Sequence, residues 1–111
     1  MDNIITFEDF TKVDLRIGTI IEVNDFPEAR RPAYQIKIDF GDLGMKKTSA
    51  QITAVYTKEE LLQKQVVAVV NFPKKQIGSF MSECLLLGAV DGREVIILNP
   101  EDQVKNGLTV S

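Results

Sequence analysis

Two uninterrupted apolar runs, residues 66–70 and 84–87, dominate the hydrophobic pattern of the chain. Short aliphatic runs bounded by turn formers are typical of strands that are covered on both faces, where polar and apolar positions have no reason to alternate. The segment between the runs is polar and holds Asn71, Pro73 and Ser82. We therefore expect a buried pair of strands whose connecting polar groups lie at the rim of a sheet, available to a ligand.

Four other segments complete an all-β pattern with short helices. Residues 15–23 and 34–40 alternate between apolar and polar positions, and residues 46–52 and 94–98 predict two further strands. Gly18 predicts a bulge or tight bend in the first strand. A capping box, Thr57 to Glu60, predicts a helix of about two turns before the buried pair. This order predicts a five-stranded OB-fold barrel with a helix between strands 3 and 4.

The N-terminal segment carries more apolar surface than a solvated tail needs. Thr6 and Asp9 favour a short helical turn, and the apolar residues around it are Ile4, Ile5, Phe7 and Phe10. Two explanations stay open, a lid over the core of the same chain and a contact in a C2 homodimer.

Composition narrows the function classes. The 111 residues predict one domain, 1–111, and a net charge of −3 with a pI near 4.9 argues against a general nucleic-acid binder. Cys84 is the single cysteine and histidine is absent, so an internal disulfide, a Cys/His zinc site and a histidine base are excluded. We expect no enzyme activity, no metal and no cofactor. The N-terminus predicts neither a signal peptide nor membrane insertion, so we expect the protein in the cytoplasm.

Six short blocks appear in one order along the chain: residues 14–20 (DLRIGTI), 26–30 (FPEAR), 38–41 (IDFG), 49–52 (SAQI), 69–73 (VVNFP) and 82–83 (SE). In order and spacing they resemble the tRNA-binding domain family, and within it the CsaA-type export-related chaperones. The resemblance implies an OB-fold, a homodimer and one of two activities. One is ATP-independent binding of unfolded or export-bound polypeptides, which the absence of a phosphate-binding loop also favours. The other is binding of tRNA through its backbone.

The resemblance also implies site residues. The positions that match the tRNA-facing residues of the family are Arg16, Ser49, Asn71, Lys74, Lys75 and Ser82. Gln76 and Met81 stand where the family often has basic residues, which lowers the positive charge of this site. The same change leaves an apolar rim, Phe72, Phe80 and Met81, which is typical of a polypeptide-binding surface. The simpler alternatives are that Asn71 caps the end of a strand and that Lys74 and Lys75 protect a sheet edge.

Overall fold

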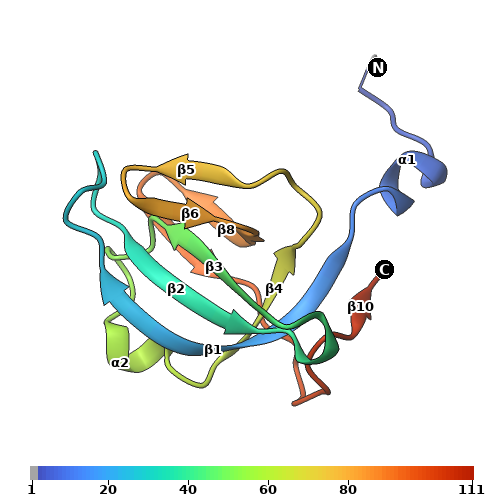
Figure 1. Ribbon diagram of the computed structural model, residues 1–111. Coiled ribbons are helices and arrows are strands. Elements are labelled where there is room, and N and C mark those ends of the chain that lie inside the picture. Colours follow the sequence, from blue (N-terminus) through green and yellow to red (C-terminus); the bar gives the residue numbers. More distant parts are fainter. Residues whose placement is uncertain (1–2) are drawn as a thin grey trace.

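A computed structural model of the chain describes residues 3–111, so Met1 and Asp2 of the predicted domain lie outside the described residues (Figure 1). The elements in chain order are α1 (Phe7–Thr11), β1 (Leu15–Asp25), β2 (Tyr34–Asp39), the 3-10 turn η1 (Gly41–Leu43), β3 (Met45–Ala50), α2 (Lys58–Leu61), β4 (Gln65–Val69), β5 (Lys75–Ile77), β6 (Phe80–Ser82), β7 (Leu85–Leu86), β8 (Gly88–Asp91), β9 (Glu94–Ile97) and β10 (Thr109–Val110).

The main sheet has the order β3-β2-β1-β4-β7, and β10 pairs with the start of β1. Each neighbouring pair is antiparallel. The sheet curls into a nearly closed barrel, and α2 follows β3 and precedes β4 at one end of it (Figure 1). The predicted capping box is present, because Thr57 Oγ1 accepts from Glu60 N at 3.2 Å and Thr57 N donates to Glu60 Oε1 at 2.9 Å. The predicted OB-fold class is confirmed.

The first apolar run is buried as predicted, whereas the second apolar run is mostly not buried. All five residues of β4 are buried, since this strand lies between β1 and β7 with both faces covered. Its Val66 and Ala68 side chains belong to the main hydrophobic core, together with Ile20 of β1, Ile38 of β2 and Phe40 just after β2. Of the second run only Cys84 is buried, whereas Leu85 is 46% exposed. The second strand, Leu85–Leu86, is shorter than predicted and lies at the end of the sheet order, where one side has no neighbouring strand.

Gly18 serves a different purpose from the bend that was predicted. The register between β1 and β2 shifts between Ile20 and Glu22, so the bulge lies beyond the glycine. A Cβ atom on Gly18 would lie 2.5 Å from Ile38 Cγ2 and 2.8 Å from the Phe40 ring. Gly18 is therefore required by the close packing of β1 on two core side chains, not by the backbone path.

Two hairpins lie outside the main sheet, and of their four strands only β9 corresponds to a predicted one, residues 94–98. One is formed by β5 and β6 and the other by β8 and β9. The first packs on the β1–β2 loop through a small second core, in which the Phe26 and Phe80 ring centroids lie 5.3 Å apart. Ser79 also donates to Glu28 of that loop at 3.1 Å. The hairpin and the loop thus form one packed unit at the top of the barrel in Figure 1.

Helix α1 projects away from the barrel, near the C-terminal end of the chain (Figure 1). None of its residues is buried, and Ile4, Ile5 and Phe7 are 78%, 64% and 78% exposed. Phe7 and Phe10 contact each other, with ring centroids 6.4 Å apart. The first explanation of the apolar segment, a lid over the core of the same chain, is therefore wrong for this conformation. An extended arm with an exposed apolar surface remains.

Candidate functional site

The six residues implied as tRNA-facing fall into two separate clusters. The first contains Arg16 and Asn71, which both contact Asp14 at the base of the α1 arm. Arg16 Nε lies 2.6 Å from Asp14 Oδ1, and its Nη1 donates to the Gly107 carbonyl at 3.0 Å. The hydrogen bond to Asp14 raises the pKa of the Arg16 guanidinium. Its charge is thus already paired, which leaves little of it for a phosphate.

Asn71 fixes the same junction. Its Oδ1 accepts from Asp14 N at 3.0 Å, and its Nδ2 donates to the Lys12 carbonyl at 2.7 Å. Both donor and acceptor of the amide bind the segment that joins α1 to β1. The alternative that Asn71 caps the end of its own strand is therefore corrected, because its side chain bonds a segment that is distant in sequence.

The second cluster gathers the other four residues around Ser82 on β6. Lys75 pairs with Ser82 in the β5–β6 register, and Ser82 Oγ accepts from Ser49 N at 3.5 Å. Lys74 Nζ lies 3.7 Å from Glu83 Oε2, and the Lys74 side chain is 67% exposed. A surface ion pair of this kind is weak, so both lysines keep their charge available to a ligand. Ser49, Lys74, Lys75 and Ser82 therefore form a candidate contact surface as a group.

The three residues of the predicted apolar rim do not form one surface. Phe80 is only 7% exposed and packs against Phe26, so its placement on the rim is corrected. Met81 pairs with Gln76 and lies on the hairpin face opposite to Phe80, because successive side chains of a strand alternate. Phe72 is 54% exposed and follows Asn71 at the base of the α1 arm. The hydrophobic pattern of the sequence did not predict the burial of Phe80, because its partner, Phe26, is distant in sequence.

A polar surface that was not predicted covers the outer face of β1, β2 and β3, and we call it the outer grid. One row runs Asn24–Gln35–Ser49 and the next runs Glu22–Lys37–Lys47, as the strand registers place these residues opposite one another. The rows are extended by Ser82, which bonds Ser49, and by Glu83, which accepts from Lys47 N at 2.9 Å. The alternation of residues 34–40 already placed Gln35 and Lys37 together on the outer face, and this signal could have revealed them.

Lys37 and Lys47 are the notable pair of the outer grid. Like charges directly opposite on neighbouring strands are destabilising. Here Glu22 lies opposite Lys37, and the Glu83 carboxylate accepts from Lys47 N. Lys47 Nζ also lies 5.3 Å from the centroid of the Phe80 ring. A shallow hollow of about 130 Å³ opens here, lined by Glu22, Asn24, Gln35, Ile36, Lys37, Lys47 and Phe80. An anion with hydrogen-bonding groups would relieve the repulsion between the two ammonium groups.

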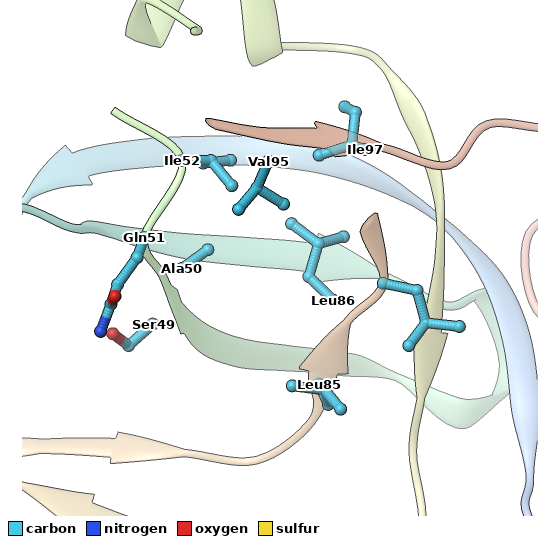
Figure 2. A pocket seen from close by; sticks show the side chains of 9 residues that line it. Ser49, Ala50, Gln51, Ile52, Leu85, Leu86, Val95 and Ile97 are labelled. Carbon is cyan, nitrogen blue, oxygen red and sulfur yellow. The ribbon is translucent and has the colours of Figure 1, made fainter. Parts of the chain in front are cut away.

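An apolar pocket lies on the other side of β3, where the barrel is not fully closed. We call it the seam pocket. It has a volume of about 270 Å³ and is lined by Ser49, Ala50, Gln51, Ile52, Leu85, Leu86, Leu87, Val95 and Ile97. Figure 2 shows Ile52, Leu86, Val95 and Ile97 around the hollow, while the polar ends of Ser49 and Gln51 lie at one margin. Pockets for drug-sized ligands usually exceed about 300 Å³, so this one suits individual aliphatic side chains.

Other candidate chemistry does not appear in residues 3–111. Burial raises the pKa of the Cys84 thiol to about 12, so the reactive thiolate is scarce near neutral pH. No group of three or more metal-ligating side chains gathers in this part of the chain. None of the helices described here is both long enough and apolar enough to cross a membrane.

Comparison with known proteins decides the family. Residues 15–109 match the family model described as "Putative tRNA binding domain". The chain belongs to the tRNA-binding domain family. Two solved structures of CsaA chaperones are similar to it over nearly their whole length. The chaperone CsaA from Bacillus anthracis strain Ames is 50% identical with a TM-score of 0.93, covering 97% of this chain and 99% of that one. The CsaA chaperone protein from Picrophilus torridus is 51% identical with a TM-score of 0.92, covering 97% of this chain and 100% of that one.

The family also includes parts of much longer proteins. Methionine–tRNA ligase from Pyrococcus abyssi (strain GE5 / Orsay) is 42% identical over 106 residues, which are 96% of this chain and 14% of the ligase. The chain thus spans about a seventh of the length of these curated relatives. It corresponds to a separate tRNA-binding-type domain of the ligases, whereas it corresponds to the full length of the two CsaA structures.

Proposed function

We propose that this chain is an ATP-independent, CsaA-like chaperone that binds unfolded or export-bound polypeptides in the cytoplasm, with residues 1–111 acting as one domain. The observation that carries the proposal is the seam pocket, an apolar hollow sized for side chains on a chain similar to CsaA proteins along their whole length. The acidic net charge of −3 also favours polypeptides over nucleic acid as the main ligand.

Aggregation of reduced insulin, followed by light scattering without ATP, tests this proposal. Leu85→Gln places a polar group at the margin of the seam pocket and should weaken the suppression of aggregation several-fold. The matched control is Val90→Gln, because Val90 is 73% exposed on β8 and does not line the pocket. Equal suppression by wild type and Leu85→Gln would remove the pocket from the mechanism.

We further propose that the protein is a homodimer held by the α1 arm. The arm exposes Ile4, Ile5 and Phe7, and Phe10 packs beside Phe7. A second copy would cover this surface, which is costly to leave in water. Deletion of residues 1–11 should convert a dimer to a monomer in sedimentation velocity at micromolar concentration. A monomeric full-length chain would contradict the proposal.

Binding of tRNA is the second candidate function, and the outer grid favours it. Lys37 and Lys47 supply two ammonium groups, while Asn24, Gln35, Ser49 and Ser82 supply amide and hydroxyl groups for sugars or unstacked bases. Lys74 and Lys75 stand at the end of the grid beside Ser82.

The test is the dependence of tRNA affinity on salt. Each phosphate contact adds about 0.7 to 0.9 to the slope of log affinity against log salt concentration, so Lys37→Gln with Lys47→Gln should lower the slope by roughly 1.4 to 1.8. Lys105→Gln together with Lys58→Gln, which lie outside the grid, is the charge-matched control. An identical slope for wild type and the grid variant would exclude this surface as the tRNA path.

A further inference from the structure

The barrel is closed between β3 and residues 82–86 mainly by side chains. Within residues 3–111 one backbone bond crosses this seam, from Glu83 N to the Lys47 carbonyl at 2.7 Å. The Glu83 carboxylate and the Ser82 hydroxyl accept from the backbone of β3, and the Thr48 hydroxyl donates to the Cys84 carbonyl at 2.9 Å. β3 and β7 stand at the two ends of the sheet order, so each keeps an edge without a ladder partner.

The backbone groups at these two edges point toward the seam pocket, and one of them, Ser49 N, already bonds Ser82 Oγ at 3.5 Å. Both backbone groups of Lys47 bond Glu83, so they point away from β2, and the alternation of a strand turns those of Ser49 and Gln51 the same way. The β2–β3 ladder ends at Ala50, and Gln51 has no backbone hydrogen bond to any of the described residues. Across the seam, Leu87 N bonds Val67, so the backbone groups of Leu86 point away from β4.

The directions of the two edges also match. Four antiparallel pairings lead from β3 through β2, β1 and β4 to β7, so β3 and β7 run parallel to each other. A segment that runs antiparallel to β3 is therefore antiparallel to β7 as well. At either edge such a segment would form antiparallel pairing, which is more stable per residue than parallel pairing.

The side chains of such a segment would have two different environments. Those that point inward meet Ala50, Ile52 and Ile97 of the main core and Leu86, which packs against that core; all four line the seam pocket. Those that point outward lie on the side of Ser49, Ser82 and Lys75. An extended segment that alternates apolar and polar residues fits both environments, because successive side chains of a strand point to opposite faces.

We propose that the polypeptide ligand binds as an added β-strand along the Ser49–Gln51 edge, with alternate aliphatic side chains in the seam pocket. This inference rests on the proposed polypeptide-binding function and specifies its mode. Main-chain hydrogen bonds then provide affinity that does not depend on sequence, and the pocket selects the alternating apolar pattern.

The test uses a fluorescein-labelled octapeptide with leucine at every second position, measured by fluorescence anisotropy. Two methylated versions carry N-methyl groups on the odd or on the even residues, so each removes the donors of one edge of the peptide. We expect at least one version to bind ten-fold or more weakly than the parent. If both methylated peptides bind like the parent, added-strand binding is overturned while polypeptide binding stands. If the parent itself does not bind, the proposed function fails as well.

A protein variant tests the hydrogen bonds of the opposite direction, in which the β3 edge donates and a peptide carbonyl accepts. Gln51→Pro removes the backbone donor at the β3 edge, and Gln51→Ala keeps the donor while losing the same side chain. We expect Gln51→Ala to bind the octapeptide like wild type and Gln51→Pro to bind it at least ten-fold more weakly. Circular dichroism checks that the proline variant folds, and if it does not, the methylated peptides decide alone. Equal binding by a folded Gln51→Pro variant would contradict the role of this edge.

Discussion

At the scale of single residues, Gln65 is a buried polar side chain that attaches the C-terminal segment to the barrel. It is 8% exposed, its Nε2 donates to the Val104 carbonyl at 2.7 Å, and its Oε1 accepts from Val104 N at 2.9 Å. We expect Gln65→Leu to lower the free energy of unfolding by about 2 to 4 kcal/mol, since it leaves both backbone groups of Val104 unpaired. Urea denaturation measures the loss. Gln103→Leu, at an exposed position, should change it by less than about 0.5 kcal/mol.

Cys84 gives the protein a measurable pH dependence. Burial raises the pKa of its thiol to about 12 in the folded chain, from an ordinary value of 9.0. The folded state therefore favours the neutral thiol, and this contribution to stability is complete below pH 9 and is lost as the pH rises toward 12. The difference in unfolding free energy between wild type and Cys84→Ala should thus shrink with rising pH, by at most about 1.4 kcal/mol per pH unit. A difference in unfolding free energy that stays constant from pH 8 to pH 11 would contradict a Cys84 thiol whose pKa is raised by burial.

Residue patterns predicted some of these roles and not others. The blocks around Ser49, Asn71 and Ser82 were located from the sequence, but their partners were not. Asn71 bonds Lys12 and Asp14, and Arg16 is paired with Asp14. Such pairings depend on where β1 and β4 meet in space, and short-range periodicity carries no information on that.

At the scale of elements, the β5–β6 hairpin depends on its contact with the β1–β2 loop. We expect Phe80→Ala to lower the free energy of unfolding by about 3 to 5 kcal/mol, because the ring is buried against Phe26. Hydrogen exchange of the hairpin amides should accelerate more than that of β4, which packs in the main core. Uniform acceleration in both elements would show that the hairpin and the barrel open together.

Strands with a recognisable hydrophobic pattern could be predicted from the sequence and the strands of the β5–β6 hairpin could not, for a physical reason. β1 and β2 are long enough for their alternation to repeat, β4 is an uninterrupted apolar run, and all three were predicted. β5 and β6 have three residues each, which is too short for a period to be recognised. The hairpin forms because Gly78 adopts a positive φ of 58° in its turn and because the second core holds it. The rim residue Phe80 was therefore misplaced together with its element.

At the scale of the whole molecule, the α1 arm should link stability to protein concentration. The barrel buries its own core, whereas the arm leaves Phe7 78% exposed unless another copy covers it. For a dimer that unfolds to monomers, a ten-fold rise in concentration adds about 1.4 kcal/mol per dimer, or roughly 0.7 kcal/mol per protomer. That corresponds to a rise in Tm of roughly 3 °C for a chain of this size.

Two variants, compared with each other, isolate the arm. Phe7→Ser should lower the Tm at high protein concentration and abolish its dependence on concentration, because the exposed side chain contacts Phe10 of the arm and would otherwise contribute to the contact between copies. Val90→Ser removes a side chain of similar exposure, 73%, from the β8–β9 hairpin and should keep the dependence of wild type. A wild-type Tm that is constant from 1 to 100 μM, within roughly 1 °C against the expected rise of about 3 °C per ten-fold step, would mean that the arm does not join two copies.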